Sequence, residues 1–252
     1  MVDLKNPSVR RILNTEFKLK GLKLIDYLLL DYMALSPIPF FILFKSERIN
    51  KPDIDLSITE IALHINFLNK NKLISILDEN DEILKLSKKT IYSILKQAYY
   101  YNHYTQKNIS LQERVIAPKK NIYPRLLLTD LGVERWEDFF KPDWSKYCSE
   151  TEFFSEKIDG ECKVVYEALN KKVIQKMNFL SLKYETPYLS EWKTIKPWKP
   201  FYWKKFELGY ALELSFLENN VDIEYLSEDV EKIHILRKWK KEWKHNYLEG
   251  LY

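Results

Sequence analysis

Glycine is scarce in this chain of 252 residues, because there are only 5 and no two of them lie close together. Phosphate-binding loops and dinucleotide-binding loops need several glycines within a few residues, since the backbone must turn tightly around a phosphate. The isolated glycines therefore exclude both kinds of loop. The G-x-S-x-G turn of the α/β-hydrolases is missing as well. We expect no bound cofactor.

Cysteine and histidine are also few, with 2 cysteines and 4 histidines. They form no C-x-x-C and no H-x-x-x-H pattern, so we expect no metal site. His234 and His245 share the last predicted helix but lie ~16 Å apart along its axis, too far for one zinc ion. A disulfide between Cys148 and Cys162 stays open, although a reducing cytoplasm is the simpler expectation. We predict no catalytic residue and a protein that is not an enzyme.

Long apolar stretches are absent too. Residues Met1–Lys20 are charged throughout and predict no signal peptide. The longest apolar run, Leu35–Phe44, is too short for a bilayer and contains two prolines, so we expect no membrane partner. A composition of 46% hydrophobic and 30% charged residues is typical of a soluble globular protein, and we expect a cytoplasmic one. The net charge of +4 is below the excess expected of a dedicated nucleic-acid binder.

The segment from Tyr123 to Trp144 is the most informative part of the chain. Arg125–Leu128 is apolar and predicts a strand, and Thr129 offers a side-chain oxygen that caps a following helix. That helix should bury three aromatic residues on one face and end before a proline, namely Trp136, Phe139, Phe140 and Pro142. One interpretation is that the strand, cap and helix serve only a core.

The Leu-Thr-x-x-Gly pattern within this segment resembles the last strand and closing helix of bacterial winged-helix proteins such as the PadR and MarR regulators. Its continuation through Trp136 to Pro142-Asp143-Trp144 is similar to uncharacterised bacterial proteins of the immunity type. The resemblance covers about twenty residues tightly and Leu22–Trp144 loosely. It implies a winged-helix-like arrangement for residues 1–144.

The fold class we expect is α+β, with a winged-helix-like region over 1–144, a boundary within 145–160, and a smaller α/β region rich in Trp and Lys over 160–252. Apolar periodicity and capping patterns predict the individual elements. Helices are expected at Leu22–Ala34, from the Ser57–Glu60 capping box, at Ser87–Tyr101, Lys171–Leu182 and Ser227–Tyr247, and strands at Leu73–Leu77, Cys162–Leu169 and Tyr210–Phe216.

An aromatic and basic segment at Trp192–Phe206 is the candidate surface for a protein partner. Trp and Tyr are over-represented among the residues that dominate protein–protein binding, and the same pattern of rings and lysines also stacks on unpaired bases. The alternative is that the rings pack inward and only the lysines meet water. The candidate partner-binding residues are Trp192, Trp198, Tyr202, Trp203 and Lys204.

Nucleic-acid binding is the competing hypothesis. If the helix from Ser57 to Asn69 entered a major groove, it would present Thr59, Glu60, His64, Asn66 and Asn69, with no Arg or Lys before Lys70, which is a poor match for phosphate. The later helix is a better candidate, and two lysines around Pro118–Asn121 suit a wing tip. The candidate nucleic-acid-binding residues are Lys88, Lys89, Lys96, Lys119 and Lys120.

We therefore expect a non-enzymatic cytoplasmic bacterial protein that binds another protein, and the immunity-type resemblance implies a toxin-neutralising role. A winged-helix DNA-binding transcriptional regulator is the alternative, and an enzyme ranks third. Many immunity proteins are acidic, whereas this chain carries a net charge of +4. That sign favours an acidic partner over a basic nuclease. The sequence leaves the oligomeric state open.

Overall fold

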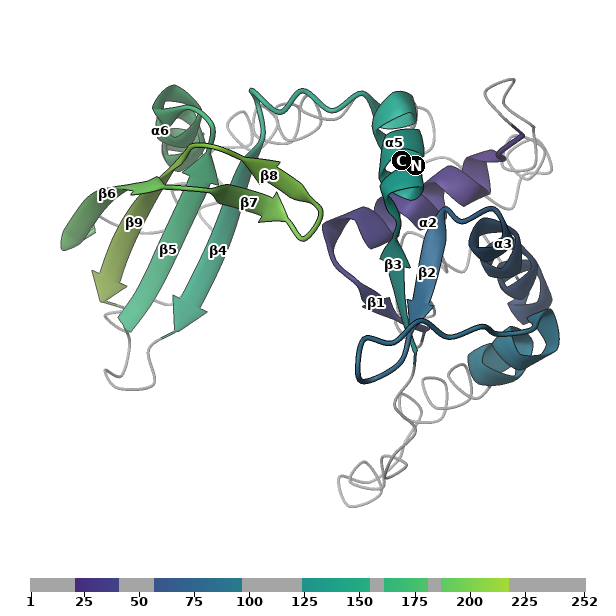
Figure 1. Ribbon diagram of the computed structural model, residues 1–252. Coiled ribbons are helices and arrows are strands. Elements are labelled where there is room, and N and C mark those ends of the chain that lie inside the picture. The colour runs from purple at the N-terminus through teal and green to yellow at the C-terminus, as the bar shows by residue number, and fades with distance from the viewer. Residues whose placement is uncertain (1–20, 41–56, 97–123, 155–160, 181–186, 218–252) are drawn as a thin grey trace, which may run out of the picture. The chain divides into compact units, whose positions relative to one another are not determined.

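A computed structural model describes residues 21–40, 57–96, 124–154, 161–180 and 187–217. These residues fall into two compact units, divided after Phe139, whereas the sequence places a boundary within 145–160. Helices and antiparallel sheets occur in both units (Figure 1), which confirms the expected α+β class. The C-terminal region was expected to be α/β, and this is wrong for the described residues, whose strands all pair antiparallel.

A three-stranded sheet forms the centre of the first unit. Its strands are β1 (Ile38–Pro39), β2 (Ile74–Leu77) and β3 (Arg125–Leu128), in the order β1-β3-β2. Strand β3 lies in the middle, and its Leu126 is opposite Ile38 on one side and Ile76 on the other. These three side chains are buried. The strand expected at Leu73–Leu77 is confirmed, as is the one at Arg125–Leu128.

Helix α2 (Leu24–Leu35) is buried nearly all round, as its apolar sequence predicts. It carries two buried carboxylates, and each is hydrogen-bonded, as buried charged groups must be. Asp26 accepts from the backbone N–H of Lys23 and lies 2.7 Å from His64 Nδ1. Asp31 accepts from Trp136 Nε1 at 2.9 Å. The two carboxylates therefore join α2 to helix α3 (Ile58–Lys70), which carries His64, and to helix α5 (Asp130–Phe140), which carries Trp136.

Helix α3 (Ile58–Lys70) begins with the predicted capping box. Ser57 Oγ accepts from the backbone N–H of Glu60, and the Glu60 carboxylate accepts from the backbone N–H of Ser57. The predicted inward stripe of Ile61, Ile65 and Leu68 is buried. A short turn then leads directly into β2.

Helix α5 (Asp130–Phe140) follows β3, and its sequence pattern has a packing explanation. Thr129 Oγ1 accepts from the backbone N–H of Gly132 at 3.1 Å and donates to the backbone oxygen of Lys72 at 2.6 Å. A Cβ on Gly132 would lie only 1.9 Å from the backbone oxygen of Leu73. The Thr therefore caps the helix, and the Gly lets the helix approach the start of β2. Trp136, Phe139 and Phe140 are buried, as predicted.

Residues 88–96 form a further helix, at the start of the one expected at Ser87–Tyr101. Ser87 Oγ accepts from the backbone N–H of Thr90 at 3.1 Å, which caps its first turn. Ile91 and Leu95 are buried, as predicted. Lys119, Lys120 and the helix expected at Ser227–Tyr247 lie outside the described residues.

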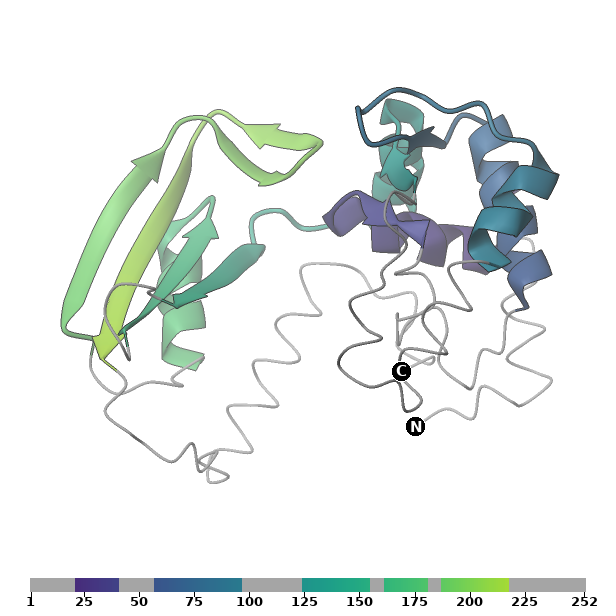
Figure 2. The same cartoon turned by 90° about the horizontal axis from the view of Figure 1, so that it is seen from below.

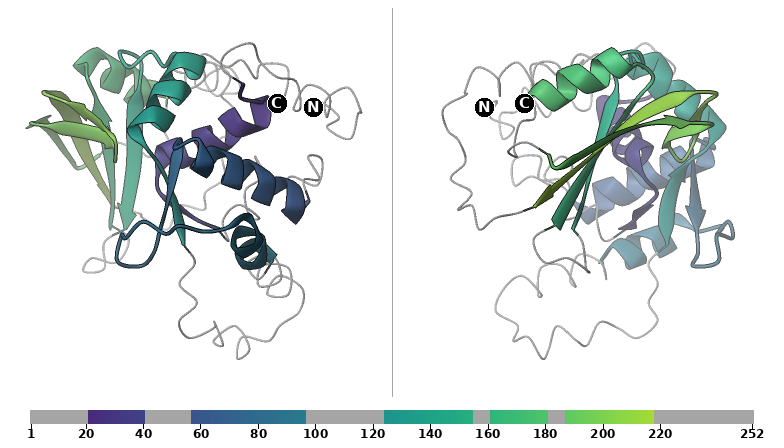
Figure 3. Two further views of the ribbon diagram at one scale, coloured as in Figure 1. Left: turned by 45° about the vertical axis from the view of Figure 1, so that its right-hand side comes forward. Right: turned by 90° about the vertical axis from the view of Figure 1, so that its left-hand side faces the viewer.

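The second unit holds a four-stranded antiparallel sheet with one helix on one face (Figures 2 and 3). The sheet order is β4-β5-β9-β6, and helix α6 packs on buried residues of β5 and β9. The predictions for β5, α6 and β9 are confirmed, whereas β4 was not expected. The bounds are Cys148–Phe154 for β4, Glu161–Ala168 for β5, Lys171–Leu180 for α6, Leu189–Ile195 for β6 and Gly209–Leu217 for β9.

The aromatic and basic segment Trp192–Phe206 is built largely from strands. After β6, a cis peptide bond joins Lys196 to Pro197, and the hairpin of β7 (Trp198–Phe201) and β8 (Lys204–Phe206) follows. The register of the hairpin shifts between Trp198 and Phe201. Within the ranges that the structure covers, no helix has the length and apolar character needed to cross a bilayer.

Candidate protein-binding surfaces

The exposed face of α3 is apolar at its centre. Leu63 is 41% exposed and Phe67 is 38% exposed, and their spacing places them on one side of the helix. Thr59 and Lys70 lie on the same side, one turn before and one turn after this pair. The sequence had suggested an outward face of Thr59, Glu60, His64, Asn66 and Asn69. In the structure, Glu60 closes the capping box, His64 bonds to Asp26, and both asparagines are half-buried.

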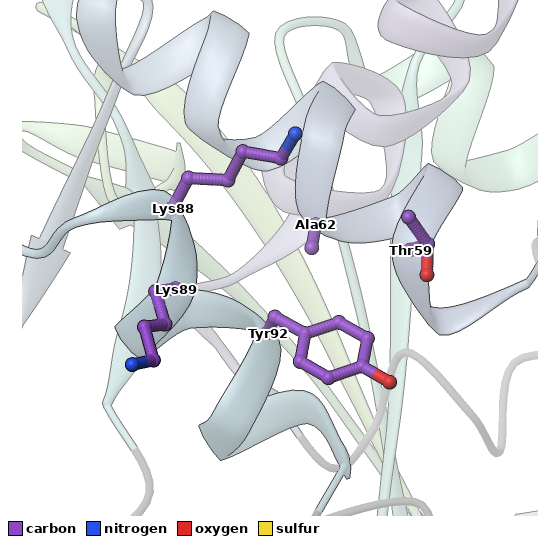
Figure 4. Close-up of a pocket in the computed structure, with 5 residues that line it drawn as sticks. All are labelled: Thr59, Ala62, Lys88, Lys89 and Tyr92. Carbon is purple, nitrogen blue, oxygen red and sulfur yellow. The ribbon is translucent and has the colours of Figure 1, made fainter.

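A groove of about 260 Å³ lies between α3 and the helix at 88–96 (Figure 4). Ala62 is buried at α3, and the ring of Tyr92 extends from the facing helix. Lys88 and Lys89 are exposed, and they lie at the side of the groove away from Thr59. Thr59 lines the groove, and Leu63 follows it one turn later on α3. The groove thus has a basic rim, and the exposed apolar pair lies on the same side of α3 as Thr59 at the groove.

We call this combination the α3 surface, and it consists of Thr59, Leu63, Phe67, Lys88, Lys89 and Tyr92. Two of the lysines that the sequence proposed for nucleic acid, Lys88 and Lys89, therefore line the groove opposite α3. Lys96 is exposed on the same later helix. Sequence reasoning missed Leu63 and Phe67. Their signal was present, because they are apolar and lie off the Ile61, Ile65 and Leu68 stripe that fills the core.

Trp198 lies in the core of the second unit. It is 1% exposed, and its Nε1 donates to Glu167 Oε2 at 3.0 Å. Its ring stacks with Phe206 at a centroid distance of 5.6 Å and with Tyr147 at 6.2 Å. Burial, with the nearby Cys148 and Glu167, raises the pKa of Tyr147. Trp198 therefore meets a partner only if this cluster opens.

Lys204 binds the rings of its own chain. Its Nζ lies 4.9 Å from the ring centroid of Trp144, 5.6 Å from that of Phe206 and 5.9 Å from that of Trp203. Such cation–π contacts stabilise the folded hairpin by roughly 0.5–1 kcal/mol each at partly exposed sites. Among the five residues predicted to bind a partner, the exposed rings are those of Trp192 at 37% and Tyr202 at 39%.

Across the residues that the structure covers, no group of three His, Cys, Asp or Glu side chains lies close enough to hold a metal ion. Cys148 and Cys162, whose pairing the sequence left open, form no disulfide with each other in the structure.

Comparisons with known proteins identify no relative of this chain. No family model, no curated protein and no solved structure matches the chain.

Proposed function

We propose that this chain acts by binding another protein, and that the α3 surface makes the contact. The observation that carries the proposal is the exposed pair Leu63 and Phe67 beside a groove with a basic rim. Exposed single apolar residues are ordinary, but an apolar pair that adjoins a groove is typical of an interaction site. An aromatic anchor surrounded by polar residues is also the usual arrangement of a binding hot spot.

The partner that fits has an apolar centre and carboxylates around it. Lys88, Lys89 and Lys70 would meet those carboxylates and speed the encounter at low salt, while Phe67 would supply much of the affinity. Inhibition of an enzyme or toxin by such contact needs only steric cover of its site. In its sharpest form, the proposal is a cytoplasmic bacterial protein that neutralises a toxin with an acidic surface near its active site.

The runner-up is a winged-helix regulator, and two observations favour it. The sheet order β1-β3-β2 and the direct passage from α3 into β2 suit a winged helix. Lys88, Lys89 and Lys96 are exposed. Against it, a helix that enters the major groove reads bases with hydrogen-bonding side chains. Leu63 and Phe67 offer none at the centre of α3, and residues 78–124 separate β2 from β3 where a tight wing would be expected.

The test is affinity capture of the tagged full chain from nuclease-treated bacterial lysate, followed by mass spectrometry. The wild type and Phe67→Ala are compared with Ile83→Ala, a matched control that removes an apolar side chain 69% exposed elsewhere in the first unit. We expect Phe67→Ala to weaken the captured complex about 30-fold, which corresponds to a hot-spot loss of about 2 kcal/mol. Ile83→Ala should bind as the wild type does.

A second pair of variants separates protein binding from DNA binding. Lys88→Glu with Lys89→Glu should slow association with the captured protein and reduce its salt dependence. If instead the wild type captures no protein, retards DNA, and loses that retardation in the double variant, the regulator hypothesis replaces the one proposed.

A further inference from the structure

Strand β6 is an edge of the four-stranded sheet, and it is exposed along almost its whole length (Figure 1). Its register with β9 runs without a break from Leu189 to Ile195, so it has no bulge, and no proline interrupts it. Natural sheet edges are usually protected by bulges, prolines or outward lysines, because a bare edge pairs with any available strand. The one lysine of β6, Lys193, is bound to Glu213 at 2.7 Å.

The sequence of this edge is self-complementary about Trp192. When two copies of β6 run antiparallel with Trp192 opposite Trp192, Glu191 of each copy lies opposite Lys193 of the other. Leu189 then lies opposite Ile195, and Ser190 opposite Thr194. Every pair is therefore matched in charge or in polarity, and such cross-strand pairs are the unit of sheet stabilisation.

We propose that β6 is a self-association edge, at which two copies of this chain join their four-stranded sheets into one of eight strands. The register is selected by charge. If the two strands were shifted so that Glu191 lay opposite Glu191, two carboxylates would face each other. A shift that placed Lys193 opposite Lys193 would bring two ammonium groups together. Of these three registers, only the one with Trp192 opposite Trp192 places each Glu191 opposite a Lys193. A strand from an unrelated protein would satisfy the backbone but would match these side chains only by coincidence.

The two faces of the sheet support the same register. Glu191 and Lys193 lie on the face away from α6, where Lys163 Nζ and Lys193 Nζ both contact Glu213, at 2.6 and 2.7 Å. Pairing of two copies extends this row of alternating charge across the junction. Trp192 lies on the α6 face, because it is opposite Leu212, which packs against α6.

The two Trp192 rings would then meet over the junction. Their Cβ atoms would lie about 4.5–5.5 Å apart, the usual separation of directly opposite residues. In the single chain each ring is 37% exposed, with Lys171 Nζ 5.1 Å from its centroid. An interface of one strand is smaller than a standard one, so the association should be reversible and depend on concentration.

The first test is sedimentation velocity of the full chain between about 1 and 200 µM, the range in which small interfaces assemble. The wild type should shift from monomer to dimer. Glu191→Lys and Lys193→Glu should each weaken the dimer about tenfold, because each creates two like-charge pairs. An equimolar mixture of the two variants should recover the dimer, since every charge pair is again opposite. Thermal melting checks that each variant is folded.

Cross-linking tests the register without altering the charges. Ser190→Cys and Thr194→Cys variants, mixed and mildly oxidised, should form a disulfide between chains, because the two positions are directly opposite. Either variant alone should not cross-link, since position 190 and its copy would lie about 14 Å apart along the strands. A wild type that stays monomeric at 200 µM would refute the proposal, as would a dimer that both charge variants leave unchanged or a Ser190→Cys variant that cross-links with itself.

Discussion

Gly209 and Trp198 make the sharpest test of the packing described for the second unit. A Cβ placed on Gly209 would lie 2.5 Å from Cγ of Trp198 and 2.6 Å from its Cβ. The indole is 1% exposed and hydrogen-bonded to Glu167, so it has no free space into which to move. We therefore expect Gly209→Ala to destabilise the second unit through this one contact.

The expected magnitude follows from two opposing effects. An alanine that fits its backbone conformation stabilises a protein by about 0.4–1 kcal/mol relative to glycine, through the unfolded state. Overpacking in a closed core costs about 1–3 kcal/mol, and it should dominate at this position. Trp198→Ala alone should cost about 3–5 kcal/mol because it leaves a cavity. In that background Gly209→Ala no longer meets the ring and should become neutral or mildly stabilising.

The assay is hydrogen exchange of β9 peptides in the wild type, both single variants and the double variant. This measurement reports the stability of the second unit separately from the first. The coupling between the two substitutions should equal the overpacking cost, about 1–3 kcal/mol. If Gly209→Ala destabilised β9 equally with and without the indole, the ring would not occupy the place described, and the core assignment of Trp198 would fail.

Three further predictions concern stability. Ser57→Ala should lower the free energy of unfolding of the first unit by about 1 kcal/mol in a urea titration, because it removes the capping oxygen of α3, and Ser57→Asp should restore most of the loss. Trp136→Phe should cost about 1.5–3 kcal/mol, since it deletes the hydrogen bond to the buried carboxylate of Asp31; an unchanged midpoint would contradict this. The pKa of Glu213 is lowered by hydrogen bonds from Lys163 and then Lys193. Its contribution to stability is therefore complete above the pKa of an unfolded glutamate, about 4.3, and is lost as the pH falls through the lowered value. Melting curves of Glu213→Gln should consequently converge with those of the wild type at the acid end and separate above pH ~5.

Elements with strong local signals were predictable. The capping box at Ser57, the Thr129 cap and the apolar run of α2 each act through residues close in sequence, and all three occur as expected. Strand β4 was missed because the sequence of Cys148–Phe154 is mostly polar. It becomes a strand through its pairing with β5, which a local pattern does not reveal.

The surfaces were less predictable than the elements. Trp192 and Trp198 have similar neighbours in the sequence, yet Trp192 is exposed and Trp198 is buried. The difference comes from Gly209 and Glu167, which offer space and a hydrogen-bond acceptor to Trp198 from other strands. The segment Trp192–Phe206 contains two prolines, and neither interrupts a regular part of the strand pairing. In the structure, Pro197 stands between β6 and β7, and Pro200 lies where the hairpin register is irregular.

The order of strands in the first sheet has a consequence during synthesis. The central strand β3 is made long after β1 and β2, because residues 78–124 lie between β2 and β3. At ordinary rates of translation this interval lasts on the order of several seconds. During this interval Ile38 and Ile76 have already been synthesised, whereas Leu126, which lies opposite both of them in the folded sheet, has not. In the second unit β9, which lies between β5 and β6, is likewise the last strand of its sheet to be made. Each unit should therefore become resistant to protease on stalled nascent chains only after its late inner strand has left the ribosome.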